Sequence, residues 1–250
     1  MVEGVADLSA EINAAQFVKR LEALQSDEEL RKIQRYFKTG KGEYGEGDVF
    51  IGVRMAHVFA LAREFIDMPP DEIEKLLDSP IHEVRAGAVS TMAKQAARPK
   101  TTPERRKELF DLYIRRHDRI NNWDLVDLGA RDVIGGYLAD KPRDLLYELA
   151  RSKVLWERRT AIVSTWYYIR EGELDDTFKI AEILLDDDQD LIHKATGWML
   201  RGAGDTDRPR FLKFLDQHAV RMPRTLLRYS IEKLPKEQRA HYLGLKKAAS

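Results

Sequence analysis

Apolar residues recur at helical spacing along nearly the whole chain, and this periodicity limits the possible fold more than any other feature. One such stripe is formed by Phe50, Val53, Val58, Leu61 and Phe65. A spacing of three and four residues is the signal of an amphipathic helix. No segment has the pattern of a strand hairpin or of a glycine-rich turn in a parallel sheet. The sequence therefore predicts an all-α protein.

Turn signals interrupt the helical pattern at short intervals. They are Gly40 to Gly47, Pro69-Pro70, Ser79-Pro80, Pro99 to Pro103, Pro142, Gly172, Gly202 to Arg208, Pro223 and Pro235. They leave about a dozen helices of roughly 10 to 17 residues each. No domain boundary is evident, so we expect one domain over residues 1–250, with disordered ends at 1–8 and 247–250.

The helical array contains internal similarity. The segment Glu83–Thr91 aligns with Glu157–Thr165 at an offset of 74 residues, which is close to two units of about 37 residues. Leu76-Leu77-Asp78 recurs as Leu184-Leu185-Asp186, and each is followed by another apolar helix. This pattern predicts a superhelical solenoid of HEAT-like antiparallel helix pairs.

Such a solenoid exposes the second helix of each pair on a concave surface. In the alignment, Arg85, Arg159 and the pair His193-Lys194 occupy comparable places. Stacking would bring these cations into one groove, where they could follow a phosphate backbone. The sequence thus predicts a concave DNA-binding groove.

Composition limits the compartment and the chemistry. The chain has no cysteine, which excludes disulfides, thiolate metal sites and a cysteine nucleophile. No run of about 18 apolar residues is present, so we expect no membrane contact through a spanning helix. The N-terminus lacks a basic and then apolar leader. We expect a cytoplasmic monomer, associated with the nucleoid when bound to DNA.

Charge is balanced overall but unevenly distributed. Residues 221–250 contain eight lysines or arginines against two acids, whereas residues 171–190 contain nine acids against Lys179. A basic pole can face phosphate while the acidic pole stays in solvent. Ordinary solvated helix faces give the same asymmetry, so charge alone does not decide between them.

The segment Asn121–Asp127 carries the clearest candidate site. Trp123 and Asp127 are four residues apart and share one helix face. An indole beside a carboxylate can hold a cationic group. The alternative is a core tryptophan beside an acid that caps its helix or pairs with Arg131.

Two later segments add candidates to this site. Arg159 could contact phosphate through its guanidinium fork, or it could form an ion pair between repeats. Trp198 could line the same site or fill the core. Gly197 costs about 1 kcal/mol in a helix relative to alanine, so it suggests the close approach of another helix. The six histidines show no paired metal-ligand spacing, and neither the glycine-rich segment 40–47 nor the acidic segment 186–190 completes a phosphate or calcium loop.

Five segments, in order and at matching intervals, resemble the DNA alkylation repair family of AlkD-like DNA glycosylases. They are Tyr36 with Phe50–Val53, Asn122–Asp127, Trp156–Ile162, Lys194–Trp198, and Leu200-Arg201. Family members can have aromatic residues where this chain has Asp190 and Leu191.

The resemblance implies an enzyme that excises positively charged N3- and N7-alkylated purines, 3-methyladenine and 7-methylguanine, from duplex DNA without base flipping. It places catalysis on Asp127, Trp123 and Trp198. DNA contacts fall to Arg159 and Tyr36, with help from Arg85, Lys194 and Arg201, and no metal or other cofactor is implied. Two alternatives remain: a solenoid that binds distorted DNA without cutting it, and a scaffold that holds a protein partner.

Overall fold

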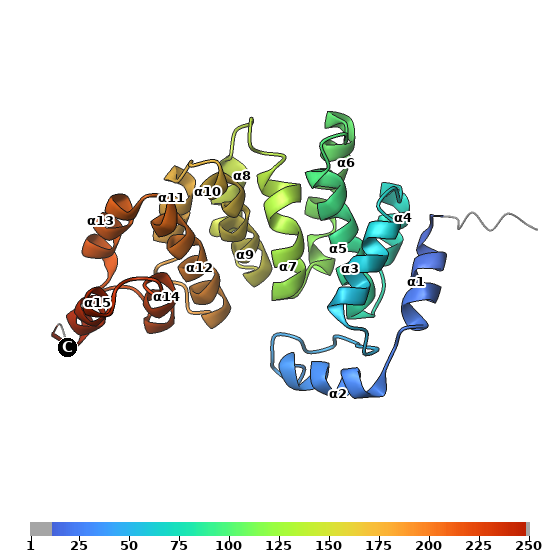
Figure 1. Ribbon diagram of the computed structural model, residues 1–250, viewed down its shortest axis with the longest axis horizontal. Helices are drawn as coiled ribbons and strands as arrows, with labels where there is room; N and C mark the ends of the chain where they lie inside the picture. Colours follow the sequence, from blue (N-terminus) through green and yellow to red (C-terminus); the bar gives the residue numbers. More distant parts are fainter. Residues whose placement is uncertain (1–11, 249–250) are drawn as a thin grey trace, which may run out of the picture. The chain divides into compact units, whose positions relative to one another are not determined.

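The computed structural model describes residues 12–248, and every regular element in that range is a helix (Figure 1). The helices are α1 (Ala14–Glu22), α2 (Asp27–Tyr36), α3 (Met55–Glu64), α4 (Pro70–Leu77), α5 (His82–Ala97), α6 (Pro103–Arg115), the 3₁₀-helix η1 (His117–Arg119), α7 (Trp123–Gly129), the π-helix η2 (Ala130–Gly135), α8 (Asp144–Ala150), α9 (Leu155–Ser164), α10 (Trp166–Arg170), α11 (Asp175–Ile183), α12 (Asp190–Thr206), α13 (Arg208–His218), α14 (Arg224–Ser230) and α15 (Lys236–Ala248). The all-α prediction is confirmed. Of the predicted disordered ends, residues 1–8 and 249–250 lie outside the described range, and residues 247 and 248 belong to α15.

The chain divides into two compact units, Met1–Leu125 and Val126–Ser250. The boundary falls inside α7. In the first unit, α5 packs against α3, α4 and α6. In the second unit, α12 packs against α9, α13 and α14. Each unit therefore has a central helix that other helices surround.

Helix starts follow from local capping chemistry. The side chains of Asn13, Ser26, Thr102 and Asp207 accept a backbone N–H from the first turn of α1, α2, α6 and α13. These residue types are favoured there because they satisfy amide groups that have no partner within the helix. A proline is the first residue of α4 and α6 and the second of α13, where its missing N–H costs nothing.

The central helices are lined by small residues that allow close packing. In α5, an added Cβ on Gly87 would lie 2.3 Å from the ring of Phe17. In α12, an added Cβ on Gly197 would lie 2.5 Å from Tyr229 Cβ and 2.8 Å from the carbonyl oxygen of Leu226. The close approach predicted from Gly197 is thus confirmed, and the neighbour is α14.

The predicted break over Gly202 to Arg208 begins too early. Helix α12 continues through Gly202 and Gly204 and ends at Thr206. Glycine is required at these two helical positions because aromatic rings occupy the space of a side chain. Ring atoms of Trp166 and Phe211 lie 2.4 and 2.5 Å from the ideal Cβ positions of Gly202 and Gly204. A glycine required by packing has the same sequence signature as one that ends a helix.

The helix–turn–helix unit predicted from sequence is present at α4–α5 and at α11–α12, in the predicted register. The alignment of Glu83–Thr91 with Glu157–Thr165, in contrast, is off by one residue. At three helix starts, one residue makes the same two contacts. Its side chain accepts the backbone N–H of the residue two positions later, and its carbonyl oxygen contacts the basic side chain six positions later. The pattern links Ser79 to Ile81 and Arg85, Ser152 to Val154 and Arg158, and Asp187 to Gln189 and His193.

The hydrogen bonds therefore match Arg85 with Arg158 rather than with Arg159. The sequence alignment pairs Glu83 with Glu157 because both are glutamates, but these two residues have different partners. Glu83 accepts from backbone amides of residues 51–53, whereas Glu157 accepts from Ser152 Oγ. Arg159 lies one residue further along its helix and points in another direction.

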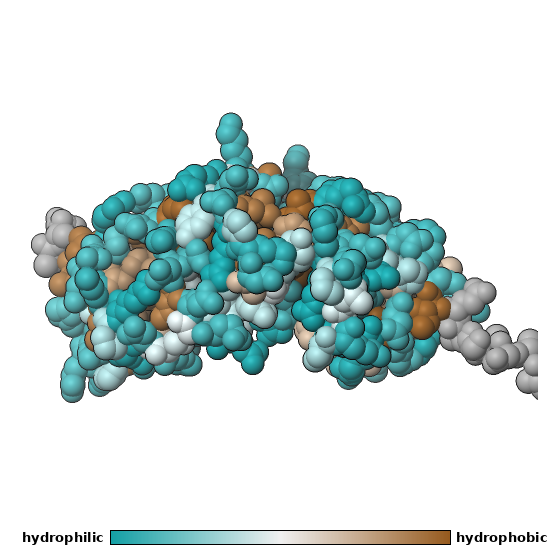
Figure 2. All heavy atoms as spheres, turned by 90° about the horizontal axis from the view of Figure 1, so that it is seen from above, coloured by the Kyte–Doolittle hydropathy of each residue, from teal (hydrophilic) through white to brown (hydrophobic). Residues whose placement is uncertain are grey.

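Polar and charged residues cover most of the surface seen in Figure 2. Within residues 12–248, no helix is both long enough and apolar enough to cross a lipid bilayer.

We predict that Gly197→Ala lowers the free energy of unfolding by about 2 kcal/mol, because the new methyl group overpacks the contact between α12 and α14. Urea unfolding followed by circular dichroism would measure this. Gly244→Ala in α15 is the matched control, since nothing lies within 4 Å of its ideal Cβ, and there the higher helix propensity of alanine should stabilise slightly. Equal effects at the two positions would contradict the packing role of Gly197.

Candidate active site

Asp127 and Arg159 form a two-pronged ion pair in the second unit. Arg159 Nε donates to Asp127 Oδ1 at 3.0 Å, and Nη2 donates to Oδ2 at 2.8 Å. The remaining Nη1 donates to the carbonyl oxygen of Leu191 at 2.6 Å. Parallel donation from a guanidinium fixes both the position and the plane of a carboxylate.

The pair is asymmetric in its exposure. The Arg159 side chain is 6% exposed, whereas that of Asp127 is 21% exposed. The buried cation thus lies behind a carboxylate that still reaches the surface. Part of this fixed anion is therefore accessible from solvent.

This geometry bears on two of the alternatives left by the sequence. Arg131 does not pair with Asp127: its Nε and Nη2 both donate to the neighbouring Asp132, at 2.9 and 2.6 Å. Arg159 forms an ion pair between helices, and its partner is Asp127 itself. Arg159 is largely buried, and three of its five N–H donors bind Asp127 and the Leu191 carbonyl. The structure thus shows it in an ion pair between helices, and its phosphate contact stays a prediction.

Trp198 lies in the same unit, on α12. It is half-buried, and its ring lies 5.8 Å from that of Trp166 at an angle of 36°. Helix α12 begins at Asp190, so the Leu191 carbonyl that accepts from Arg159 lies in its first turn. One helix thus carries both Trp198 and a contact that holds the ion pair.

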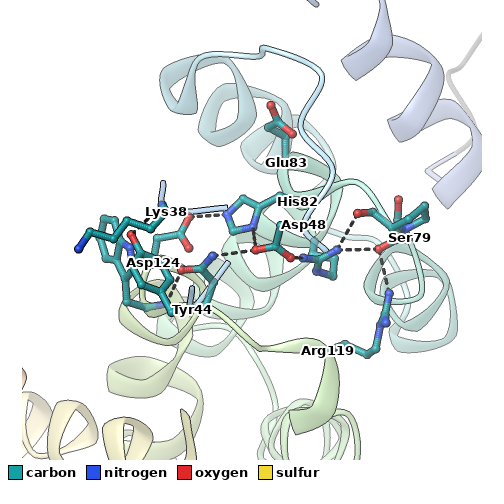
Figure 3. A network of polar contacts seen from close by, with 12 residues as sticks. Lys38, Tyr44, Asp48, Ser79, His82, Glu83, Arg119 and Asp124 are labelled. Carbon is teal, nitrogen blue, oxygen red and sulfur yellow. Dashed lines mark hydrogen bonds and ion pairs between the residues drawn. The ribbon is translucent and has the colours of Figure 1, made fainter. Parts of the chain in front are cut away.

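A second polar cluster, in the first unit, surrounds the start of α7 (Figure 3). The ring of His82 lies between two carboxylates, with Nε2 2.7 Å from Asp124 Oδ2 and Nδ1 3.5 Å from Asp48 Oδ2. Asp48 Oδ2 also accepts from Asn122 Nδ2 at 2.8 Å, and Asp48 Oδ1 accepts from Arg85 Nη2 at 2.6 Å. The Oδ1 of Asn122 in turn accepts the backbone N–H of Trp123 at 2.8 Å.

Burial and charge act in opposite directions on His82. Its side chain is fully buried, which lowers its pKa, but its contacts with Asp124 and Asp48 and their negative charges outweigh this effect and raise the pKa to about 9. His82 is therefore an imidazolium at neutral pH. Burial raises the pKa of Asp48, but its contacts with His82 and Asn122 and the charges of His82 and Arg85 keep it below its usual value.

An aromatic group covers this cluster. Trp123 stacks on Phe37, with ring centroids 5.6 Å apart and ring planes at 17°. The ring centroids of Phe37 and Phe50 lie 5.1 and 4.7 Å from that of His82, and the two phenyl rings lie 5.0 Å from each other. Tyr36 meets Trp123 edge-on at 5.9 Å and remains 67% exposed. Trp123 is half-buried.

The other predicted DNA-binding residues differ in how far their side chains are exposed and in their ion-pair partners. Arg85 is 3% exposed, and it donates to Ser79 O, Pro80 O and Asp48, so the structure shows it supporting other residues, and its phosphate contact stays a prediction. Lys194 is 41% exposed and pairs with Asp190 at 2.7 Å. Arg201 pairs with Glu232.

Three polar residues of the His82 cluster, in the first unit, were not identified from the sequence: Asp48, His82 and Glu83. Their partners lie 30 to 74 residues away along the chain, so no local spacing pattern connects them. The one sequence signal for this cluster is the glycine at position 52, which can mark a backbone conformation or a close contact that a side chain would not allow. Its φ is +80° and an added Cβ would lie 2.3 Å from Ser26 O, and Glu83 binds its amide at 2.9 Å. Among the described residues, no group of three or more histidines and acids is arranged to hold a metal ion.

Comparison with known proteins identifies the family of this chain. The family model described as "DNA alkylation repair enzyme" matches residues 17–234. No curated protein matches the sequence. Among solved structures, the fold is similar to a "Predicted DNA alkylation repair enzyme from Enterococcus faecalis", with a TM-score of 0.65 and 18% identity over 85% of this chain and 97% of that chain. The family match supports a role in DNA repair with DNA as the partner, and the chain belongs to the DNA alkylation repair enzyme family.

Proposed function

We propose that this protein is a DNA glycosylase that removes N3- and N7-alkylated purines, such as 3-methyladenine and 7-methylguanine, from duplex DNA. The reaction is hydrolysis of the N-glycosidic bond. The observation that carries the proposal is the Asp127 carboxylate, which is fixed by a buried arginine and still partly exposed.

The chemistry of the substrate explains why one fixed carboxylate is sufficient. An N3- or N7-alkylated purine already carries a positive charge, so it leaves as a neutral base without being protonated. As the bond between C1′ and the base breaks, positive charge develops on the sugar, as in glycoside hydrolysis. A preorganised anion stabilises that charge without having to reorient during the reaction.

Asp127 has a second role in this proposal. A water molecule that hydrogen-bonds to the carboxylate would be oriented toward C1′, where its oxygen forms the new bond as the bond to the base breaks and its proton passes to the carboxylate. Arg159 is a positioning residue, because it holds both oxygens of Asp127 and anchors them to Leu191 O. Leu191 replaces a residue that can be aromatic in the family, but the contact uses its backbone carbonyl and does not depend on the side chain.

The aromatic residues supply apolar and π surfaces. Trp198, and Trp123 on the same helix as Asp127, would pack against deoxyribose and attract the cationic lesion through their ring faces. Selectivity would then come from the charge and the lability of the lesion, without extrusion of the base into a pocket. Exposed Tyr36 would contact the DNA strand.

Phosphate contacts come from cations that are not buried. Lys194 and Arg201 are partly exposed and are held by acids, Asp190 and Glu232, that a phosphate could replace. Arg85 and Arg159 instead support other residues of the two clusters. A protein that only binds DNA would share these contacts but would lack excision, so the decisive experiment measures base release.

We expect Asp127→Asn to lower the single-turnover rate of 7-methylguanine release by about 100-fold or more, because a neutral amide does not stabilise the developing cation. Affinity for the duplex should change by less than about twofold, since one carboxylate contributes little to phosphate binding. Asp111→Asn on the exposed side of α6 is the matched control. Wild-type activity in Asp127→Asn would refute the mechanism. Intact binding with no release of either alkylpurine by the wild type would leave a DNA-binding protein.

We predict that Lys194→Ala weakens binding equally for damaged and undamaged duplexes and reduces the slope of log K against log salt by about 0.9, the loss of one phosphate contact. Fluorescence anisotropy over a salt series measures the slope. Lys179→Ala, an exposed lysine on α11, should leave it unchanged. An unchanged slope in Lys194→Ala would remove this residue from the DNA interface.

A further inference from the structure

We propose that His82 is a positioning residue for base excision: by bridging Asp48 and Asp124, it clamps the first turn of α7, the helix that carries Trp123 and Asp127. This inference rests on the proposed function. It concerns a residue that lies outside the sequence segments from which that function was inferred.

Two separate attachments connect His82 to the start of α7. The first is direct, from Nε2 to Asp124 Oδ2 at 2.7 Å. The second begins with a longer ion pair, from Nδ1 to Asp48 Oδ2 at 3.5 Å without a hydrogen bond. It continues by hydrogen bonds through Asn122 to the backbone N–H of Trp123. That N–H belongs to the first turn of the helix, where amides have no partner within the helix. His82 is therefore joined to α7 through a side chain and through the backbone (Figure 3).

Asp124 depends on this contact. Its Oδ2 meets His82, and its Oδ1 is buried with no hydrogen-bond partner among the described residues. The Asp124 side chain is 12% exposed, and a carboxylate this far removed from water becomes unfavourable when it loses its cationic partner. Replacing the imidazolium would therefore push Asp124 toward solvent and move the first turn of α7 with it.

The rings provide a third connection. Phe37 lies against both His82 and Trp123, with centroid distances of 5.1 and 5.6 Å. A shift of the imidazole thus reaches the indole through one intervening ring. In the proposed reaction the indole faces the sugar, and a displacement of about 1 Å can cost as much as a hundredfold in rate.

Charge explains why a histidine occupies this position. The groups that face it are Asp48 from the segment before α3, Asp124 from α7, and the rings of Phe37 and Phe50; Arg85 from α5 lies behind Asp48. Glu83, also buried on α5, is bound by backbone amides of residues 51–53. Loss of the His82 proton removes one of the two buried cations beside Asp48 and Asp124, and its pKa of about 9 sets the pH at which the clamp should weaken.

The test compares His82→Gln with the wild type at pH 7. Glutamine keeps polar atoms near the site but cannot be a cation with two carboxylate partners. We expect the maximal single-turnover rate of 7-methylguanine release to fall by about tenfold or more, while the protein concentration at half-saturation changes by less than about twofold. In a two-dimensional NMR spectrum, the indole N–H signal of Trp123, assigned through Trp123→Phe, should shift.

His57→Gln is the matched control, because His57 is exposed on α3 of the same unit; its rate and indole signal should match the wild type. A His82→Gln variant with the wild-type rate would overturn the proposal. Should this variant fail to fold, the wild type itself provides the test. Its Trp123 indole signal should change as the pH rises through about 9, and a signal constant from pH 7 to 10 would overturn the clamp.

The NMR measurement separates this proposal from the proposed function. A wild type that releases no alkylated base, but whose indole signal responds to His82 as described, would refute the glycosylase and keep the clamp on α7. Base release that is independent of His82 would refute the clamp and keep the glycosylase.

Discussion

The contact of Arg159 with Asp127 and Leu191 O is the interaction on which the rest of the second unit depends. It joins α7, α9 and the first turn of α12 through a single buried guanidinium. Removing one member of a buried ion pair leaves an uncompensated charge, at a cost of about 3 kcal/mol or more. The helices at this contact are held by polar chemistry as well as by apolar packing.

This pair combines a structural and a chemical requirement. A carboxylate that stabilises a developing cation must be ionised and immobile before the reaction begins. Arg159 supplies both conditions from the buried side, and the partly exposed face of Asp127 remains for the substrate. The first unit has a similar arrangement near the start of α7, where the buried cations His82 and Arg85 hold the carboxylates of Asp124 and Asp48 in place.

The sequence predicted those features that local spacing encodes. The all-α fold followed from apolar periodicity, and the close approach at Gly197 followed from a glycine inside a helix. The alignment of Glu83–Thr91 with Glu157–Thr165 was off by one residue because its two glutamates align in sequence but have different partners. The roles assigned to Arg85 and Arg159 required knowledge of burial. Asp48 and His82 meet only through tertiary contacts, which no spacing in one sequence reveals.

The central claim is that Arg159 serves catalysis through Asp127, and a double-mutant cycle on the single-turnover rate of 7-methylguanine release tests it most directly. Arg159→Lys, Asp127→Asn and the double variant would be compared with the wild type, with circular dichroism confirming that each is folded. If Arg159 acts through the carboxylate, its substitution should slow the wild type by about tenfold or more and should have little effect once Asp127 is asparagine. Fully additive losses would contradict this account and give Arg159 a role of its own.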